Sequence, residues 1–261
     1  MTELVDRTAL AASGVDLSGR RVLVTGAGSG IGAACARRFA AAGAEVVVLD
    51  LHADAAASVA AEVGGRPVTL DLSDLDAVDA LPVDVDVLVN NAGLQHVAPV
   101  EDFPPARFSL LLRVMLEAPF RLVRAALPGM YARGYGRVVN VSSVHGLRAS
   151  PYKSAYVAAK HGLEGLSKVV ALEGGPHGVT SNTICPAYVR TPLVEGQIEA
   201  QAQAHGITAA EVVEKVLLTQ PAIKRLVAPE EVAELAVYLC AEQASFINGA
   251  SLAMDGGWTA R

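Results

Sequence analysis

The chain has 261 residues, 52% of them hydrophobic, and a formal net charge of −6. This length and hydrophobic content are enough for one large buried core. The negative charge, without a long basic run, argues against nucleic acid or an anionic membrane surface as the main partner. The three cysteines, Cys35, Cys185 and Cys240, are far apart and lack metal-ligand spacing, so we expect buried thiols, a reducing compartment and no metal site.

The first 19 residues are polar and small, and we expect an extended tail before a domain that covers residues 20–261. This segment contains acids and no continuous apolar stretch, so it does not predict a secretory signal. No apolar run in the chain reaches the length of a membrane span. We therefore expect a cytoplasmic protein.

Short β-rich runs alternate with helical stretches along the chain. We predict strands at residues 21–25, 45–50, 66–72, 85–93, 136–143, 179–187 and 250–257. We predict helices at 31–43, at 53–64, shortly after residue 72, in two segments between 105 and 133, over a segment that contains Lys153 and Tyr156 and runs to about 173, over 191–220 with a break at 206, and from 229. Most strands are apolar on both faces, which is typical of a parallel sheet covered by helices on each side. The sequence predicts a single-domain α/β fold, a Rossmann-type doubly wound sheet of seven parallel strands.

Polar and glycine residues follow the predicted strands at the points where the strands end. In such sheets the carboxyl ends of the strands meet at one edge, where ligands bind. The residues in question are Gly26 to Gly32, Asp50, Asp71, Asn91 to Gly93, Ser143 to His145, and Pro186 to Thr191. We therefore predict one composite site at this edge.

The segment GAGSGIG (26–32) lies between the first strand and the first helix. Glycines there let backbone N–H groups approach a diphosphate at the positive end of a helix. The strict G-x-G-x-x-G pattern fails from Gly26, because Ile31 stands at its last place, but the looser form ending in Ala33 fits from Gly28. A tight turn that needs positive φ is the alternative explanation.

Asp50 ends the second strand, eighteen residues after Gly32. A carboxylate there can accept hydrogen bonds from adenosine ribose hydroxyls and would repel a 2′-phosphate. No arginine follows it, since the next residues are Leu51 and His52. The pattern favours NAD over NADP, although a surface acid at the start of a loop is an alternative.

Three residues, Lys153, Tyr156 and Lys160, have the i, i+3, i+7 spacing that places side chains on one helix face. A phenol has a pKa of about 10, and a neighbouring ammonium lowers it toward the range useful for proton transfer. Ser143, on the preceding loop, could hold the same substrate oxygen. We predict that Ser143, Tyr156 and Lys160 perform acid–base catalysis on an alcohol or ketone. The alternative is an amphipathic helix with a packed tyrosine and a solvated lysine.

Taken together, these segments resemble the short-chain dehydrogenase/reductase family over residues 20–258. The matching parts are TGAGSGIG, Asp71-Leu72, NNAG, Ser143, Tyr156-x-x-x-Lys160 and PAYVRT. The resemblance implies that Tyr156 is the acid–base, that Lys160 orients the nicotinamide ribose, and that the protein is a homo-oligomer, usually a tetramer. The cofactor contacts that it implies are Gly26, Ser29, Gly30, Ile31, Gly32, Asp50, Asp71, Leu72, Asn91, Ala92, Gly93, Tyr156, Lys160, Pro186, Val189 and Thr191.

Within the family, NNAGLQHVAPVEDFP, HGLRASPYKSAYVAAKHG, PLVEGQI and DGGWTA resemble the D-3-hydroxybutyrate dehydrogenases. This implies reversible NAD-dependent oxidation of D-3-hydroxybutyrate to acetoacetate, with residues 191–220 as a helical substrate lid. A carboxylate taken out of water needs a cation and hydrogen-bond donors. The substrate-binding residues implied are Gln95, Ser143, His145, Lys153, Tyr156 and Gln197. For Gln95, His145, Lys153 and Gln197, the alternative is a solvated surface role or a role in shaping a loop.

The sequence departs from the family pattern at Met115, where the family has a catalytic asparagine, and at Ala187, where glycine is usual. A thioether cannot donate a hydrogen bond, so our hypothesis is that activity survives with a weakened proton relay. The stretch Gly174-Gly175-Pro176 should end the helix that carries Tyr156. A dehydrogenase of another hydroxy acid or small alcohol, or an NAD-binding regulator with weakened catalysis, stays open as an alternative function.

Overall fold

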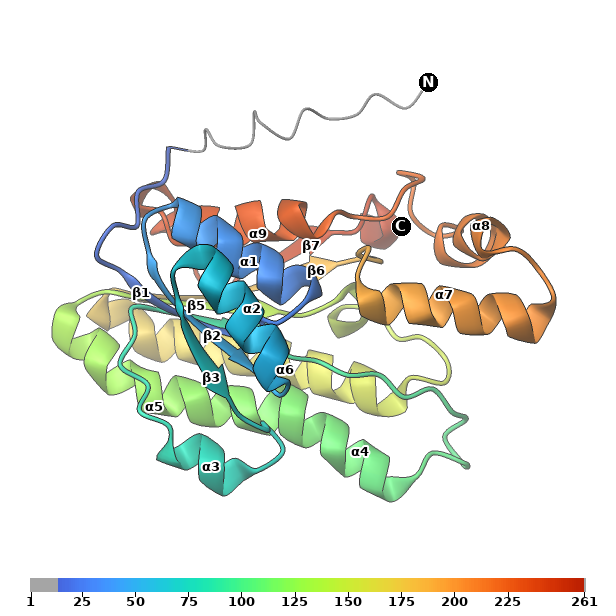
Figure 1. Cartoon of the computed structure of the whole chain (residues 1–261), viewed down its shortest axis with the longest axis horizontal. Helices are drawn as coiled ribbons and strands as arrows, with labels where there is room; N and C mark the ends of the chain where they lie inside the picture. Colours follow the sequence, from blue (N-terminus) through green and yellow to red (C-terminus); the bar gives the residue numbers. More distant parts are fainter. Residues whose placement is uncertain (1–13, 261) are drawn as a thin grey trace.

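A parallel sheet of seven strands forms the centre of the molecule (Figure 1). The computed structural model describes residues 14–260, apart from the side chains at 200, 201 and 203–205, so most of the expected N-terminal tail lies outside the described residues. All neighbouring strands are parallel, in the order β3-β2-β1-β4-β5-β6-β7. Their bounds are β1 (Arg21–Thr25), β2 (Glu45–Asp50), β3 (Arg66–Thr69), β4 (Val87–Asn90), β5 (Gly136–Val141), β6 (Val179–Pro186) and β7 (Ser251–Met254).

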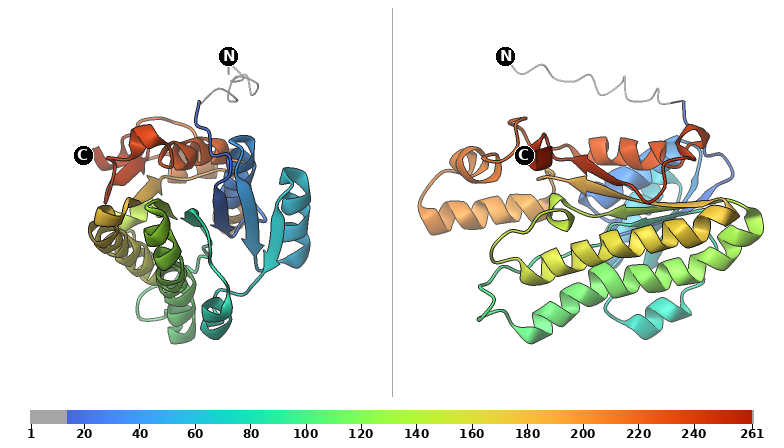
Figure 2. Two further views of the ribbon diagram at one scale, coloured as in Figure 1. Left: turned by 90° about the vertical axis from the view of Figure 1, so that its left-hand side faces the viewer. Right: turned by 180° about the vertical axis from the view of Figure 1, so that it is seen from behind.

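Helices cover both faces of this sheet, which gives three layers (Figure 2). One face carries α1 (Gly30–Ala41), α2 (Ala53–Val63) and α9 (Pro229–Tyr238). The other carries α3 (Leu75–Ala80), α4 (Pro105–Leu112), α5 (Ala118–Arg133) and α6 (Ser154–Gly174). The predicted doubly wound α/β fold is confirmed.

The strands are apolar on both faces because each face has its own hydrophobic core. Val22 and Val24 of β1 pack with Phe39 of α1 in one cluster, whereas Leu23 between them packs with Leu122 of α5 in the other. Alternate side chains of a strand point to opposite faces, so a strand buried on both sides needs an unbroken apolar run. Burying one such side chain contributes about 1.5–3 kcal/mol. All three cysteines are buried and free, as expected.

Some element boundaries differ from the sequence prediction. Strand β3 ends at Thr69, before Asp71. The two helices expected between residues 105 and 133 are joined by a π-helical turn, η2 (Arg113–Glu117). Helix α6 ends at Gly174 and passes into a 3₁₀ turn, η4 (Gly175–His177), where the glycine-proline stretch predicted its end.

A smaller helical unit projects beyond the sheet, at the right of Figure 1. It contains α7 (Pro192–His205), a left-handed Gly206 with φ of 62°, α8 (Ala209–Val212) and the π-turn η5 (Val213–Leu217). Ile198, Val212 and Leu217 belong to a hydrophobic cluster separate from the two main cores, which also includes Leu226 and contacts Tyr188 outside the unit.

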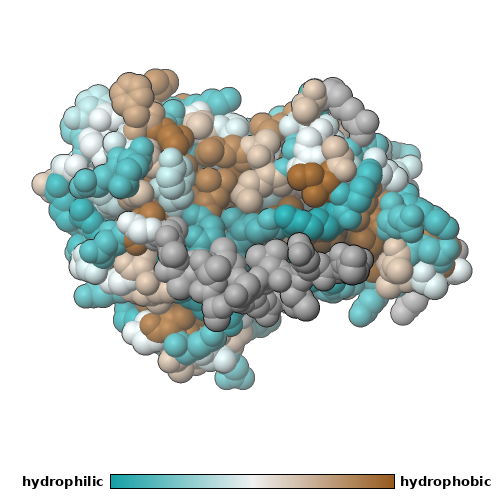
Figure 3. Space-filling model, turned by 90° about the horizontal axis from the view of Figure 1, so that it is seen from above, coloured by the Kyte–Doolittle hydropathy of each residue, from teal (hydrophilic) through white to brown (hydrophobic). Residues whose placement is uncertain are grey.

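The molecular surface has a mixed character. Seen from above, hydrophobic side chains lie in patches between hydrophilic ones (Figure 3). Among residues 14–260, no helix has both the length and the apolar character that crossing a membrane requires.

Candidate active site

The glycine turn after β1 has a shape that only glycine permits. Gly26 and Gly30 have φ of 62° and 52°, in the left-handed region that favours glycine. A Cβ at Gly32 would overlap the Gly26 carbonyl oxygen. The Asn91 side chain donates hydrogen bonds to the carbonyl oxygens of Thr25 (2.9 Å) and Gly26 (3.1 Å), which ties the turn to the end of β4. Gly26 and Gly30 line a cleft, and their lack of side chains fits a diphosphate that approaches the backbone closely.

A cleft with a volume of about 580 Å³ runs along the carboxyl ends of the strands. Every sequence-predicted cofactor residue except Gly32 lines it, and so do Ser143, Tyr156 and Lys160. The start of the projecting unit, from Thr191 to Val194, closes one side. The glycine turn, the acidic residues and the Ser143, Tyr156 and Lys160 trio therefore share one cleft, whereas the other predicted substrate residues, Gln95, His145, Lys153 and Gln197, are not among its lining residues.

Asp50 is the buried acid of this cleft, 9% exposed. Its carboxylate accepts hydrogen bonds from the backbone N–H groups of Gly28 (2.8 Å) and His52 (3.0 Å). Lys160 is the only lysine or arginine among the described residues that line the cleft. The end of the cleft near Asp50 is thus acidic.

Ser143, Tyr156 and Lys160 come together at the opposite end of the cleft. Ser143 precedes the 3₁₀ turn η3 (Val144–Gly146), and its hydroxyl accepts a hydrogen bond from the backbone N–H of His145 at 3.1 Å. The Lys160 ammonium donates to the Val141 carbonyl oxygen at 2.7 Å and lies 5.6 Å from the centroid of the Tyr156 ring. This arrangement fixes both side chains of α6 beside the serine.

The electrostatics of this trio differ from the sequence prediction. Burial raises the pKa of Tyr156, and a hydrogen bond from Ser143 opposes the rise only in part. The prediction that neighbouring ammonium groups lower this pKa is wrong for the protein without its cofactor, because desolvation penalises the phenolate more. Burial also lowers the pKa of Lys160 to about 8.

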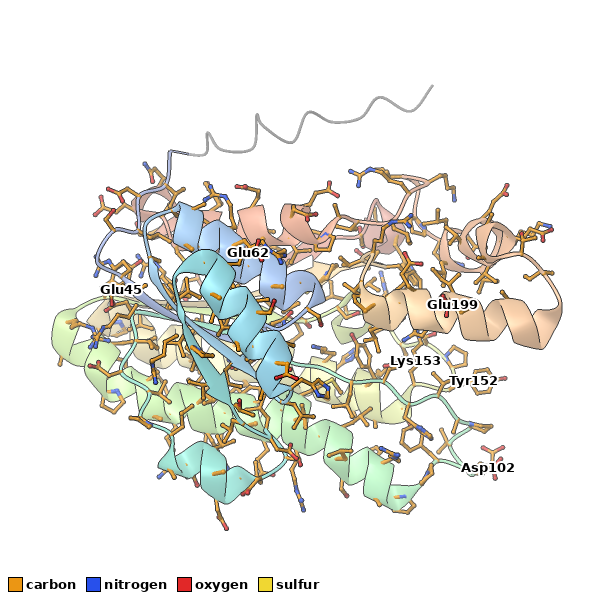
Figure 4. All side chains as sticks on the ribbon, in the orientation of Figure 1. Glu45, Glu62, Asp102, Tyr152, Lys153 and Glu199 are labelled. Carbon is orange, nitrogen blue, oxygen red and sulfur yellow. The ribbon has the colours of Figure 1, made fainter. Side chains whose placement is uncertain are left out.

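Lys153 does not share a helix face with Tyr156 and Lys160, and that prediction is wrong. Helix α6 begins at Ser154, and Lys153 is its N-cap. The Lys153 ammonium is instead 3.2 Å from Nε2 of His145. Burial, together with the Lys153 charge, lowers the pKa of His145 to about 4, so its neutral ring accepts the hydrogen bond. Figure 4 shows Lys153 between α7 and the loop that carries Asp102.

Two aromatic residues that the sequence reasoning missed form a wall beside this pair. The Trp258 ring lies 5.6 Å from the His145 ring and stacks on Tyr188 at 6.0 Å. The Tyr188 ring is in turn 5.4 Å from the Lys153 ammonium. Both residues lie in segments that carried the family resemblance, PAYVRT and DGGWTA. Their aromatic side chains were the one feature of the sequence that could have indicated an apolar wall at the site.

The two predicted glutamines are placed differently. Gln95 follows β4, and its Oε1 is buried without a hydrogen-bond partner among the described residues, which leaves it available to a ligand donor. Gln197 lies partly buried on α7, with no hydrogen bond to another described side chain. The structure thus gathers His145, Lys153 and Tyr156, but it does not bring Gln197 into contact with them.

Met115 occupies the π-turn η2 and is 1% exposed. It packs in an apolar cluster with Leu111, Ala155 and Ala159, the last two from the helix of Tyr156. The side chain therefore helps to seat α6.

We expect Met115→Asn to lower the free energy of unfolding by about 1–3 kcal/mol, because it buries an amide in this apolar cluster. Denaturant titration measures this change, with Met254→Leu on β7 as a conservative control. An unchanged stability together with a raised kcat would show instead that the methionine limits proton relay.

Comparison with known proteins identifies the class that this fold and cleft define. Residues 26–259 match a family model described as enoyl-(acyl carrier protein) reductase. The chain belongs to the short-chain dehydrogenase/reductase family, and it is an oxidoreductase of the type that binds a nicotinamide cofactor.

Several relatives are similar over nearly their whole length. A D-beta-hydroxybutyrate dehydrogenase of Rhizobium meliloti is 44% identical, covering 93% of this chain and 99% of the relative. One from Cupriavidus necator is 43% identical, covering 94% and 100%. Among solved structures, a putative 2-deoxy-D-gluconate 3-dehydrogenase of Agrobacterium tumefaciens with bound NADP superimposes with a TM-score of 0.84 at 34% identity, covering 95% of this chain and 100% of that one.

Proposed function

We propose that the protein catalyses the reversible, NAD-dependent oxidation of D-3-hydroxybutyrate to acetoacetate. The observation that carries this proposal is the Lys153 ammonium. It is partly buried, and it has no carboxylate partner among the described residues. A desolvated cation without a counter-ion favours an anionic ligand.

The surroundings of Lys153 narrow the choice of anion. His145 is neutral, and the rings of Tyr188 and Trp258 supply an apolar wall. The His145 ring is also 6.2 Å from the ring of Tyr156, so the cation and the acid–base lie within the reach of one small molecule. A short acid whose hydroxyl-bearing carbon is two bonds from the carboxyl carbon fits this arrangement.

When bound, NAD supplies the hydride acceptor. Ser143 holds the substrate oxygen, and Tyr156 takes the hydroxyl proton in oxidation or returns it in reduction. Because the pKa of Tyr156 is raised, the phenol is protonated at neutral pH and suited to reduction, and oxidation becomes easier as the pH rises. Lys160 is placed to hold the cofactor ribose and to stabilise the phenolate.

We propose the unit from residue 191 to 220 as the lid. Its first residues already line the cleft, and most of its buried side chains belong to a cluster apart from the two main cores, as suits a segment that closes over a substrate. Gln197 would contact the substrate when the lid closes.

We also propose that the protein is a homo-oligomer, a tetramer. Three large hydrophobic side chains that a subunit interface could bury support this proposal: Val169, Leu172 and Phe246 are 50%, 79% and 102% exposed.

The acidic end of the cleft favours NAD, and this choice needs its own test because the similar Agrobacterium structure contains NADP. We expect kcat/KM to be at least about 10-fold higher with NAD than with NADP, since a 2′-phosphate would meet Asp50 and no nearby cation. Asp50→Asn should narrow this ratio. Asp54→Asn, in the first turn of α2, is the control. A wild-type preference for NADP would contradict the proposal.

The direct test of the proposed function is NADH formation by the purified protein with NAD and D-3-hydroxybutyrate, compared with the L-isomer and with other hydroxy acids and small alcohols. Turnover selective for the D-isomer is expected. Turnover of an uncharged alcohol alone would point to another dehydrogenase activity. NAD binding without turnover of any substrate would favour an NAD-binding regulator.

A further inference from the structure

A buried carboxylate lies directly below the candidate catalytic site. Glu164 is one helical turn beyond Lys160 on α6, and it is 5% exposed. Its Oε2 accepts hydrogen bonds from the hydroxyls of Thr183 (2.6 Å) and Ser251 (2.5 Å), and its Oε1 accepts one from the Cys185 thiol (3.2 Å). A side chain at Gly146 would crowd Oε1, so the turn that follows Ser143 leaves room for this carboxylate.

This carboxylate has an unusual set of partners. Buried carboxylates are normally paired with a cation, yet Glu164 forms no ion pair among the described residues. Its three donors are neutral and come from two strands, β6 and β7. They satisfy the hydrogen-bonding capacity of the carboxylate without cancelling its charge. The negative charge is therefore free to act on the ammonium one turn away.

We propose that Glu164 is a positioning residue that keeps the Lys160 side chain in its ammonium form inside the buried site. The inference rests on the proposed role of Lys160 in the reaction, and it adds a residue that acts through Lys160 without touching substrate or cofactor. Within residues 14–260, Lys160 itself donates a hydrogen bond to the Val141 carbonyl oxygen, a neutral acceptor, and forms no ion pair. A buried ammonium with a neutral acceptor needs a nearby negative charge to stay protonated.

The other ionisable groups around this pocket do not supply that charge. Tyr156, on the same helix, is a neutral phenol, and His145 on η3 is neutral at pH 7. Burial raises the pKa of the Cys185 thiol on β6 to about 12, so it too is neutral. Ser142 and Ser143, which follow β5, and Ser251 on β7 contribute neutral hydroxyls. Asp255, which follows β7, accepts hydrogen bonds from the backbone N–H and hydroxyl of Thr259 and stays ionised, but it is not among the groups that raise the pKa of Lys160.

The sign of the effect follows from the charges. Burial lowers the pKa of Lys160 to about 8, and two neighbouring groups, first Cys185 and then Glu164, act against this fall. Because the Cys185 thiol is neutral near pH 8, the charge that opposes the fall is that of Glu164. Removing the charge should therefore lower the pKa further, so that Lys160 loses its proton near neutral pH. At a separation of one helical turn and the effective dielectric of a protein, the shift is about one pH unit or more.

The experiment is an NMR titration of the full-length protein labelled with ¹³Cε-lysine. The chain has only five lysines, so the Lys160 resonance can be assigned with Lys160→Arg. Glu164→Gln keeps the shape and can hydrogen-bond the same hydroxyls, which both donate and accept. Glu164→Met is a second variant without charge, since apolar replacements of buried charges are often tolerated. Ser251→Ala removes one hydrogen bond but keeps the charge.

We expect the Lys160 titration midpoint to fall by about one pH unit in Glu164→Gln and Glu164→Met and to stay near the wild-type value in Ser251→Ala. A midpoint unchanged in the folded charge-free variants would overturn the proposal, and so would an equal fall in Ser251→Ala. Loss of folding in both charge-free variants would assign Glu164 a structural role instead. The titration needs no substrate, so its result is independent of whether D-3-hydroxybutyrate is turned over.

Discussion

Tyr156→Phe should reduce kcat for D-3-hydroxybutyrate oxidation by about 1,000-fold, because it removes the group that accepts the hydroxyl proton. General acid–base catalysis contributes about 10²–10⁴ in rate. Phenylalanine keeps the ring, so the apolar contacts of Tyr156 with the cluster around Met115 remain. NADH affinity, measured by fluorescence, should change by less than about threefold.

Tyr131→Phe is the matched control for this experiment. It removes a hydroxyl from α5, on a partly exposed ring that stacks on His177 away from the cleft. Its kcat should equal that of the wild type. A Tyr156→Phe enzyme that retains more than about a tenth of wild-type kcat would show that another group moves the proton.

Lys153→Met should lower kcat/KM for D-3-hydroxybutyrate by about 100-fold or more. Losing one partner of a desolvated charge pair costs about 2–5 kcal/mol, and each 1.4 kcal/mol is a factor of ten. Methionine keeps most of the chain length and removes the ammonium. The loss should fall on acids alone, so kcat/KM for 2-butanol, which has no carboxylate, should stay within about threefold of the wild-type value.

The control for the lysine is Lys168→Met, an exposed lysine of the same helix. It changes the net charge equally and should leave kcat/KM unaltered for both substrates. An equal loss for the acid and for 2-butanol in Lys153→Met would mean that Lys153 supports the fold of the site and does not bind the carboxylate.

The parts of the site that the sequence predicted share one property, which is that each follows a strand of the sheet. The glycine turn, Asp50, Asn91 and Ser143 are fixed by their place after β1, β2, β4 and β5, so strand order alone brings them to one edge. The apolar runs that predicted the strands are short, but they recur between helical segments along the whole sheet. The fold and the position of the cleft could therefore be predicted from local sequence patterns.

The features that were mispredicted depend on contacts between distant segments. Lys153 turns toward His145 because the helix begins one residue later than its spacing suggested. The wall of Tyr188 and Trp258 joins residues 70 positions apart in the chain. The raised pKa of Tyr156 depends on how deeply the ring is buried. Neither spacing nor composition carries this information.

Tyr152 illustrates the same limit. It is the one non-glycine among the described residues with a left-handed backbone, at φ of 66°. Its carbonyl oxygen accepts a hydrogen bond from the N–H of Ala98 at 3.0 Å, which joins the loop after β4 to the residue before Lys153. This contact offsets the strain of the left-handed conformation. No residue preference of tyrosine would predict it.

The central claim is that one cleft holds the substrate between Tyr156 and Lys153, and a crystal structure with NAD and acetoacetate tests it most directly. Both ligands are oxidised, so no hydride can pass and the complex is stable. We predict the keto oxygen within hydrogen-bond distance of the Tyr156 and Ser143 hydroxyls and the carboxylate within hydrogen-bond distance of the Lys153 ammonium. An acetoacetate carboxylate bound elsewhere, with the Lys153 ammonium hydrogen-bonded to His145 alone, would contradict the proposed role of Lys153.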